Sequence, residues 1–222
     1  MPPVISIVGR AKSGKTTMVE NLISELGRRG YRVASLKHAQ EIHFEAGKDS
    51  ERHLAAGSEV VGLVGGKRMV VLRPADSETD LQGIARHLGG EFDVVIAEGF
   101  KQGNAPKILL HRSDLDEAPA NLKRVVAVAG DEVSSYAVRR FGLDDYVAIA
   151  DFIEQGYILP QSERFSVYIN GQSLPLIMFP RQIMAGVIMG MLRSLKGVGL
   201  IRYAEIRLGQ RTAEQTRHQT LR

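Results

Sequence analysis

The stretch Val4-Ile5-Ser6-Ile7-Val8-Gly9-Arg10-Ala11-Lys12-Ser13-Gly14-Lys15-Thr16 decides the fold of this 222-residue chain. Its first five residues are a short, mostly β-branched run that is typical of a buried strand. The remainder fits the phosphate-loop pattern G-x-x-x-x-G-K-[ST], and residues 17–29 carry apolar side chains at helical spacing. The order of strand, glycine-containing loop and helix predicts that the loop binds the phosphates of a nucleoside triphosphate.

The residue types in this loop have chemical reasons. Backbone N–H groups and the start of the following helix must face the anion, so side chains must be absent where the backbone approaches it, as at Gly9 and Gly14. Lys15 is predicted to reach the β- and γ-phosphates, and the Thr16 hydroxyl to bind Mg²⁺. The alternative is a chance match in a glycine-rich turn, which the position between a strand and a helix disfavours.

Strands and helices alternate along the following residues. Further strands are expected at 31–36, 93–97, 107–110 and 124–129, and helices near 49–56 and 81–88. A glycine-linked pair, 59–64 and 68–72, is expected to insert an antiparallel hairpin into the sheet. Because strands without alternation are buried on both faces, we predict an α/β fold with a doubly wound, mainly parallel sheet of the P-loop NTPase type.

The sequence pattern changes around residues 158–165. An apolar run at 165–169 leads into Asn170-Gly171, the strongest short hairpin signal, and a helix at 180–196 and a strand at 203–208 complete a small β-β-α-β unit. The predicted domains are a P-loop nucleotide-binding domain at 1–160, a small C-terminal α+β extension at 161–208, and a tail at 209–222 that is expected to be disordered.

Composition excludes several classes of protein. The chain has no cysteine, which excludes disulfides, thiolate metal sites and cysteine nucleophiles. A net charge of +4, no Trp and 6% aromatic residues, without a recognisable module, predict no nucleic-acid partner.

The most apolar stretch, Ile183 to Leu192, is well short of the roughly 20 residues that span a bilayer, and no signal peptide begins the sequence. We expect a cytoplasmic protein with no membrane partner.

A doubly wound sheet binds its ligands at the carboxyl ends of the strands. Glu98 follows a buried strand at that edge, so we predict that it acts on Mg²⁺ or on the attacking water; a solvated strand-end carboxylate is the alternative. Asp93 enters the same strand at the opposite edge, about 15 Å away at 3.3 Å per residue. The predicted catalytic residues are Glu98 and Lys15, and the predicted metal ligands are Thr16 and Glu98.

Several neighbouring residues keep two interpretations. Lys37 and His38 follow the second strand at the same edge and are predicted to face phosphate or a second ligand. His38 and His43 are either surface residues or metal ligands, and without a third ligand the surface is favoured. Asp49-Ser50 is either a helix cap or a ligand contact, and capping is favoured. Asp131 is the best-placed carboxylate to accept from guanine N–H groups, and an ordinary loop aspartate is the alternative.

Four segments together resemble the MobB family of molybdenum-cofactor synthesis. The segments are Gly9 to Thr17, Lys37-His38, Gly47 to Gly57, and Glu98-Gly99-Phe100-Lys101 followed by Pro106-Lys107. The first is common to P-loop proteins, whereas the third and fourth, in this order and spacing, are specific. The resemblance covers about residues 3–150, and the segment 38–46 is shorter than in the family and lacks its aspartate.

The resemblance implies a homodimeric GTP-binding adapter with weak intrinsic GTPase activity. Such a protein assists the guanylyltransferase, a MobA-like enzyme, that converts molybdopterin to its guanine dinucleotide, and either pterin compound is then a candidate second ligand. The residues expected to contact the nucleotide are Gly9, Ser13, Gly14, Lys15, Thr16, Thr17, Lys37, His38 and Asp131.

Two other functions share the same loop. A small-molecule kinase usually adds a lid with arginines and an acceptor site, and residues 99–124 hold Arg112 and Arg124 but no long basic lid. A nucleotide-switch ATPase or metallochaperone is expected to be richer in histidine and carboxylate clusters. Both remain alternatives to the adapter.

Overall fold

The structure is a computed structural model that describes residues 2–39, 48–74, 81–115, 119, 121–131, 133, 135–161, 165, 167–169, 172–174, 176–201, 204 and 206. The chain divides into two compact units, Met1–Arg164 and Phe165–Arg222. The loop that decides the fold lies in the first unit.

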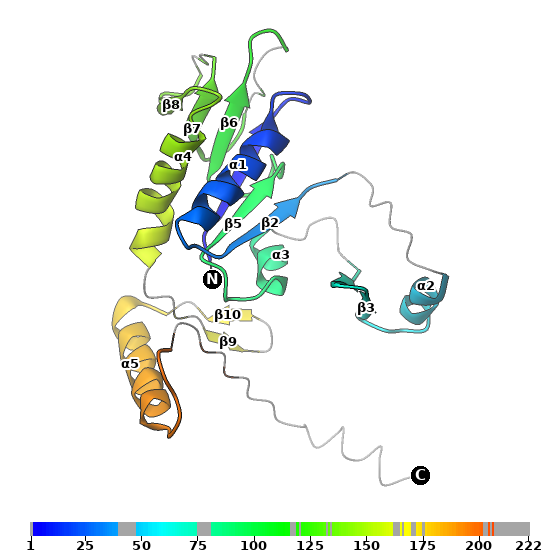
Figure 1. Ribbon diagram of the computed structural model, residues 1–222, viewed down its shortest axis with the longest axis vertical. Coiled ribbons are helices and arrows are strands. Elements are labelled where there is room, and N and C mark those ends of the chain that lie inside the picture. The colour runs from blue at the N-terminus through cyan, green and yellow to red at the C-terminus, as the bar shows by residue number, and fades with distance from the viewer. Residues whose placement is uncertain are drawn as a thin grey trace. The chain divides into compact units, whose positions relative to one another are not determined.

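The first unit is built on a parallel sheet. Its strands in the described part of the chain are β1 (Val4–Gly9), β2 (Val33–Lys37), β5 (Val94–Glu98), β6 (Lys107–His111), β7 (Val125–Gly130) and β8 (Arg139–Phe141). Their order is β2-β5-β1-β6-β7-β8, and every pairing between them is parallel (Figure 1). The predicted α/β fold with a mainly parallel sheet is confirmed.

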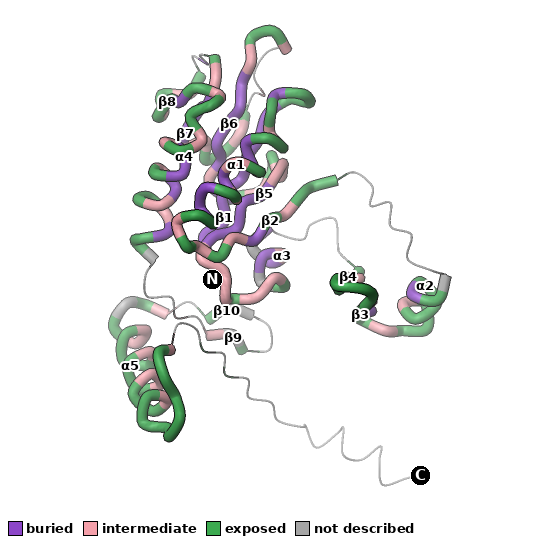
Figure 2. Tube along the Cα trace, in the orientation of Figure 1, coloured by how far each residue is buried: buried purple, intermediate pink, exposed green. Residues whose placement is uncertain are grey.

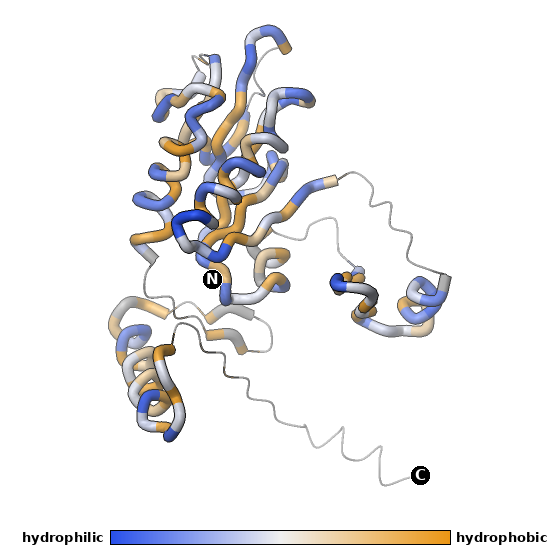
Figure 3. The backbone as a smooth tube through the Cα atoms, viewed as in Figure 1, coloured by the Kyte–Doolittle hydropathy of each residue, from blue (hydrophilic) through white to orange (hydrophobic). Residues whose placement is uncertain are grey.

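Helices cover both faces of this sheet. Helices α1 (Lys15–Arg28) and α4 (Tyr146–Ile153) pack on one face, in a core that includes Leu22 and Ile149, while α3 (Leu81–His87) packs on the other. Helix α4 continues into the π-helical η1 (Glu154–Ile158) and the short 3₁₀ helix η2 (Leu159–Gln161). Figures 2 and 3 show that the buried and the most hydrophobic parts of this unit coincide with the central strands. The absence of alternation in these strands follows from their burial on both faces.

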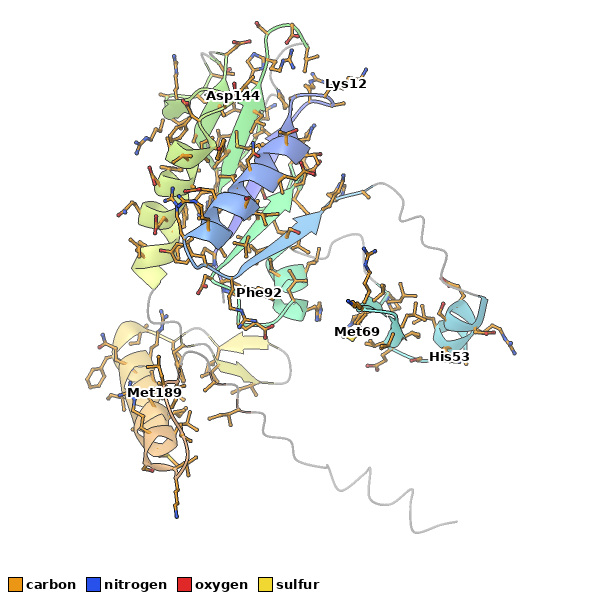
Figure 4. The ribbon with its side chains drawn as sticks, viewed as in Figure 1. Lys12, His53, Met69, Phe92, Asp144 and Met189 are labelled. Carbon is orange, nitrogen blue, oxygen red and sulfur yellow. The ribbon has the colours of Figure 1, made fainter. Side chains whose placement is uncertain are left out.

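The parallel registers bring the ends of three strands together. Glu98, the last residue of β5, lies beside Ile7 of β1 and beside Lys37, the last residue of β2. Figure 4 shows Lys12, in the loop between β1 and α1, at one end of the unit and Phe92, which precedes β5, at the other. The residues predicted to act on the nucleotide therefore share one edge of the sheet.

The glycine-linked hairpin differs from the prediction. Strands β3 (Val61–Gly65) and β4 (Arg68–Leu72) are antiparallel, but they form a two-stranded sheet of their own and were wrongly expected within the main sheet. Helix α2 (Lys48–Ala55) precedes them. The hairpin satisfies its ladder by its own pairing and leaves apolar side chains in solvent, with Val64 81% exposed. Strand β8 and helix α4 were not expected from the sequence.

The second unit contains the hairpin and the helix expected of it. Strands β9 (Val167–Ile169) and β10 (Gln172–Leu174) are antiparallel, and α5 (Met178–Ser194) follows. The Asn170-Gly171 turn lies outside the described residues, as do most of the expected strand at 203–208 and the tail at 209–222. Among the described residues, no helix is long and apolar enough to cross a membrane.

The packing of α1 against the sheet gives a test of the fold. Leu22 is fully buried in the core under α1, so Leu22→Ala should lower the free energy of unfolding by about 2–5 kcal/mol through lost burial and a cavity. Ser24→Ala, at an exposed position of the same helix, should change it by no more than about 0.5 kcal/mol. Urea unfolding measures both, and equal effects of the two substitutions would contradict the packing described.

Candidate functional site

The loop between β1 and α1 is a backbone cradle with no room for a side chain at its start. A Cβ atom on Gly9 would lie 2.5 Å from the carbonyl oxygen of Leu110 and 2.6 Å from Ser13 Oγ. Lys12 and Gly14 both have positive φ, 64° and 90°, and the Gly14 carbonyl accepts the first helical hydrogen bond from Met18 N. These turns direct the loop around the start of α1, where successive N–H groups can face an anion.

One polar atom of this loop has no partner within the structure. The Ser13 side chain is 1% exposed, and its Oγ makes no hydrogen bond among the described residues. Buried hydroxyls are ordinarily hydrogen-bonded, so an unpaired one needs an explanation. A phosphate oxygen held in the loop would supply the missing acceptor.

Lys15 is folded back onto the loop. Its Nζ donates to the carbonyl of Arg10, which places the ammonium group over the cradle. Burial is the main cause that lowers the pKa of Lys15; Glu98 raises this pKa, and the charges of Lys101 and Lys37 lower it. A partly buried cation whose charge is costly by itself is stabilised when an anion lies beside it.

The Glu98 side chain, at the end of β5, contacts residues of α1 and β2. Its Oε1 accepts a hydrogen bond from Thr16 Oγ1 at 3.0 Å, and its Oε2 lies 3.8 Å from Lys37 Nζ. The Glu98 side chain is only 15% exposed, whereas Lys37 is 65% exposed. Of the residues predicted for the site, the structure brings Lys15, Thr16, Lys37 and Glu98 together.

The turn after β5 holds the next residues of the site. Gly99 and Phe100 both adopt left-handed backbone conformations, with φ of 91° and 57°. The His38 ring packs edge-on against Phe100 at a centroid distance of 5.2 Å, and His38 N donates to the Glu98 carbonyl. Lys101 follows this turn and was not among the predicted site residues, although its place in the Glu98–Lys101 segment was a signal for it.

Asp131 also lies at the carboxyl edge, after β7. Its Oδ2 accepts from both the backbone N–H and the hydroxyl of Ser113, at 2.6 and 2.7 Å, and these bonds hold the pKa of Asp131 below its ordinary value. Ser113 was not among the residues predicted for the site. In this structure the Asp131 carboxylate connects the end of β7 to the segment after β6 through these two hydrogen bonds.

The other polar residues weighed in the sequence lie elsewhere. Asp93 is at the opposite edge, where its Oδ2 accepts from Arg32 N. Asp49 lies in the first turn of α2 and pairs with Arg52, and His43 is outside the described residues. No group of three or more His, Asp and Glu side chains that could hold a metal ion occurs in the described part of the chain.

The sheet order, the glycine-lined loop and the lysine at the start of α1 define a protein of the P-loop nucleotide-binding class. Comparisons with known proteins then identify the group within that class. The family described as molybdopterin guanine dinucleotide synthesis protein B, MobB, matches residues 4–131. The chain belongs to this family.

Individual relatives agree with the family match. The chain is 36% identical over 157 residues to a molybdopterin-guanine dinucleotide biosynthesis adapter protein of Haemophilus influenzae. The aligned residues cover 68% of this chain and 88% of that protein. The adapter protein of the same name from Escherichia coli is 30% identical over 161 residues, covering 69% and 92%. A crystal structure of molybdopterin-guanine biosynthesis protein B is similar with a TM-score of 0.53 and 27% identity, covering 68% of this chain and 98% of that one.

The clearance at Gly9 gives a test of the loop. Gly9→Ala should weaken binding of a magnesium nucleoside triphosphate at least about tenfold, because the added methyl group displaces the loop from Leu110 O and Ser13 Oγ. Gly27→Ala is the matched control, since a Cβ on Gly27, near the C-terminal end of α1, would meet open space and alanine favours helix over glycine by up to about 0.5–1 kcal/mol. Titration calorimetry measures both affinities. Unchanged binding by Gly9→Ala would show that the loop does not hold the phosphates.

Proposed function

We propose that this chain is a GTP-binding adapter in the biosynthesis of molybdopterin guanine dinucleotide. It holds GTP with Mg²⁺, hydrolyses it slowly, and assists a MobA-like guanylyltransferase. The observation that carries the proposal is the convergence of Lys15, Thr16 and Glu98 on the phosphate loop of a MobB-family chain.

The loop atoms support the triphosphate. The cleared space at Gly9, the unpaired Ser13 Oγ and the ammonium group of Lys15 are what a bound polyphosphate chain requires. Gly14 and Thr17, at the start of α1, complete the residues assigned to the nucleotide in this loop. Asp131 is proposed to recognise guanine, which requires it to release Ser113 when the base binds.

The spacing of two oxygen atoms supports Mg²⁺. Neighbouring ligands of an octahedral Mg²⁺ ion, each about 2.1 Å from the metal, are about 3.0 Å apart. Thr16 Oγ1 and Glu98 Oε1 are separated by 3.0 Å, and hard oxygen donors are the ligands that Mg²⁺ prefers. We assign Thr16 and Glu98 to the metal, which would neutralise phosphate charge, and Lys15 and Glu98 to catalysis of hydrolysis.

The names of the relatives support a helper role. The two relatives of Haemophilus influenzae and Escherichia coli are named adapter proteins, and an adapter acts through a partner. The exposed apolar side chains of the β3–β4 hairpin, with Val64, Met69 and Val71 each more than half exposed, support a homodimer. Lys37 and His38 are assigned to a second ligand, molybdopterin or its guanine dinucleotide, and the proposed location is the cytoplasm.

The proposal predicts a preference for guanine and a fate for the γ-phosphate. GTP should displace a fluorescent GTP analogue at a concentration at least about tenfold lower than ATP does, both with Mg²⁺ present. In single-turnover reactions the γ-phosphate of GTP should be released slowly to water. Titration of the full-length chain and thin-layer analysis of labelled phosphate measure the two properties.

Three outcomes would contradict the proposal in different ways. Equal displacement by GTP and ATP would remove the guanine preference and favour a nucleotide-switch ATPase. Transfer of the γ-phosphate to an added small-molecule acceptor would identify a kinase. Failure of both nucleotides to displace the analogue would reject nucleotide binding at this loop.

A further inference from the structure

The segments that follow β6 and β7 lie side by side at the carboxyl edge of the sheet. His111, the last residue of β6, pairs with Gly130, the last residue of β7. Asp131 N donates to the His111 carbonyl at 3.0 Å, and a Cβ atom on Gly130 would lie 2.1 Å from that same oxygen. The backbone at Asp131 is therefore held against β6, and its carboxylate can change partners only by rotation of the side chain.

The residues from Arg112 to Leu115 form a closed turn that presents Ser113. Leu115 N donates to the Arg112 carbonyl at 3.1 Å, and the Arg112 guanidinium makes two hydrogen bonds to the Asp114 carboxylate, at 3.0 and 2.7 Å. Within this turn, the backbone N–H and the hydroxyl of Ser113 both donate to Asp131 Oδ2, at 2.6 and 2.7 Å. The turn thus places both donors of Ser113 on one oxygen of Asp131.

The Asp131 carboxylate is only half available to a ligand. A carboxylate offers about four acceptor sites, two on each oxygen. Ser113 fills both sites of Oδ2, and Oδ1 accepts no hydrogen bond among the described residues. Guanine presents two adjacent N–H donors, at N1 and at its 2-amino group, and these engage both oxygens of one carboxylate. Guanine and Ser113 consequently compete for Oδ2.

Adenine is not a competitor for Oδ2. The corresponding edge of adenine carries one donor, the 6-amino group, beside an acceptor at N1. Adenine can therefore engage a single carboxylate oxygen, and Oδ1 is available for that contact. The two hydrogen bonds from Ser113 oppose the binding of guanine more than that of adenine.

We propose that Ser113 is a specificity-determining residue, which lowers the affinity of the site for guanine nucleotides by competing with the base for Asp131. The inference rests on the proposed function, because it requires that Asp131 accepts hydrogen bonds from guanine. The location suits a base, since β7 lies two strands from β1 in the sheet, about 10 Å away at about 4.8 Å per strand. The sugar and the first phosphate of a nucleotide can bridge that distance from the loop after β1.

The sign of the effect distinguishes this role from ordinary recognition. A serine that contacted the ligand, or that held Asp131 in place for it, would weaken binding when its hydroxyl is removed. A serine that competes with the base strengthens binding when its hydroxyl is removed, because one of the bonds that guanine must displace is absent. In a protein that acts by binding its nucleotide, this competition sets the concentration of GTP at which the protein is loaded.

The test measures displacement of a fluorescent GTP analogue from the full-length chain by GTP and by ATP, both with Mg²⁺. Ser113→Ala should tighten the binding of GTP about fivefold, because the hydroxyl is one of the two competing donors, and should change that of ATP less than about twofold. Ser113→Thr, which keeps a hydroxyl at this position, is the matched control and should bind both nucleotides as the wild type does.

A second measurement checks the hydrogen bonds themselves in solution. The backbone N–H of Ser113 and then its hydroxyl lower the pKa of Asp131. Ser113→Ala should therefore raise this pKa part of the way to its ordinary value, whereas Ser113→Thr should leave it low. Carbon-13 NMR of the carboxyl group in the protein without nucleotide gives the value. An Asp131 pKa that is the same in the wild type and in Ser113→Ala would overturn the inference.

Asp131→Asn separates this inference from the proposed function. Equal affinities of the wild type for GTP and ATP, or an Asp131→Asn variant that keeps the preference for GTP, would contradict the proposed recognition of guanine by Asp131. If Asp131→Asn loses that preference, the effect of Ser113→Ala decides the inference alone. Selective tightening of GTP supports it, whereas weaker or unchanged binding of GTP, or equal tightening of GTP and ATP, overturns it.

Discussion

The close approach of the loop backbone to the neighbouring strand at Gly9 is the constraint on which the site depends. β1 lies in the middle of the sheet, between β5 and β6, so the chain that leaves it must turn within the space bounded by Leu110 O. Only a residue without a Cβ atom can make that turn. The path of the turn then determines where α1 begins, with Lys15 and Thr16 as its first residues. The path of the loop from β1 to α1, which carries the groups proposed to bind phosphate, therefore depends on this clearance.

Glu98 extends that geometry across the sheet. Because β1, β5 and β2 are parallel neighbours in register, a single carboxylate at the end of β5 reaches Thr16 on one side and Lys37 on the other. Its low exposure makes these interactions less screened than those of surface pairs. The carboxylate thus links the start of α1 to the end of the edge strand β2.

The loop after β1 and the strand ends that carry Lys37 and Glu98 could be predicted from the sequence, because the patterns that indicate them are local. A glycine pattern between a strand and a helix identifies the loop, and the rule that parallel strands end at one edge places Lys37 beside Glu98. The position of the β3–β4 hairpin outside the main sheet was not predictable in this way, because hairpin signals report the pairing of two strands and not their neighbours. Helix α4 was missed since its apolar run, Tyr146–Ile153, has few polar residues to reveal a helical period. The bond between Asp131 and Ser113 depends on the pairing of β6 with β7, which the spacing along the chain does not encode.

Binding of Mg²⁺-GTP to the Lys15→Ala variant tests the central claim most directly. The ammonium group of Lys15 over the loop should contribute enough that the variant binds on the order of 100-fold more weakly than the wild type. Circular dichroism should show an unchanged fold, and Lys123→Ala, which removes the same charge at the other edge of the sheet, should bind as the wild type does. A Lys15→Ala variant that is folded and binds Mg²⁺-GTP as tightly as the wild type would contradict the assignment of this loop as the site of the triphosphate.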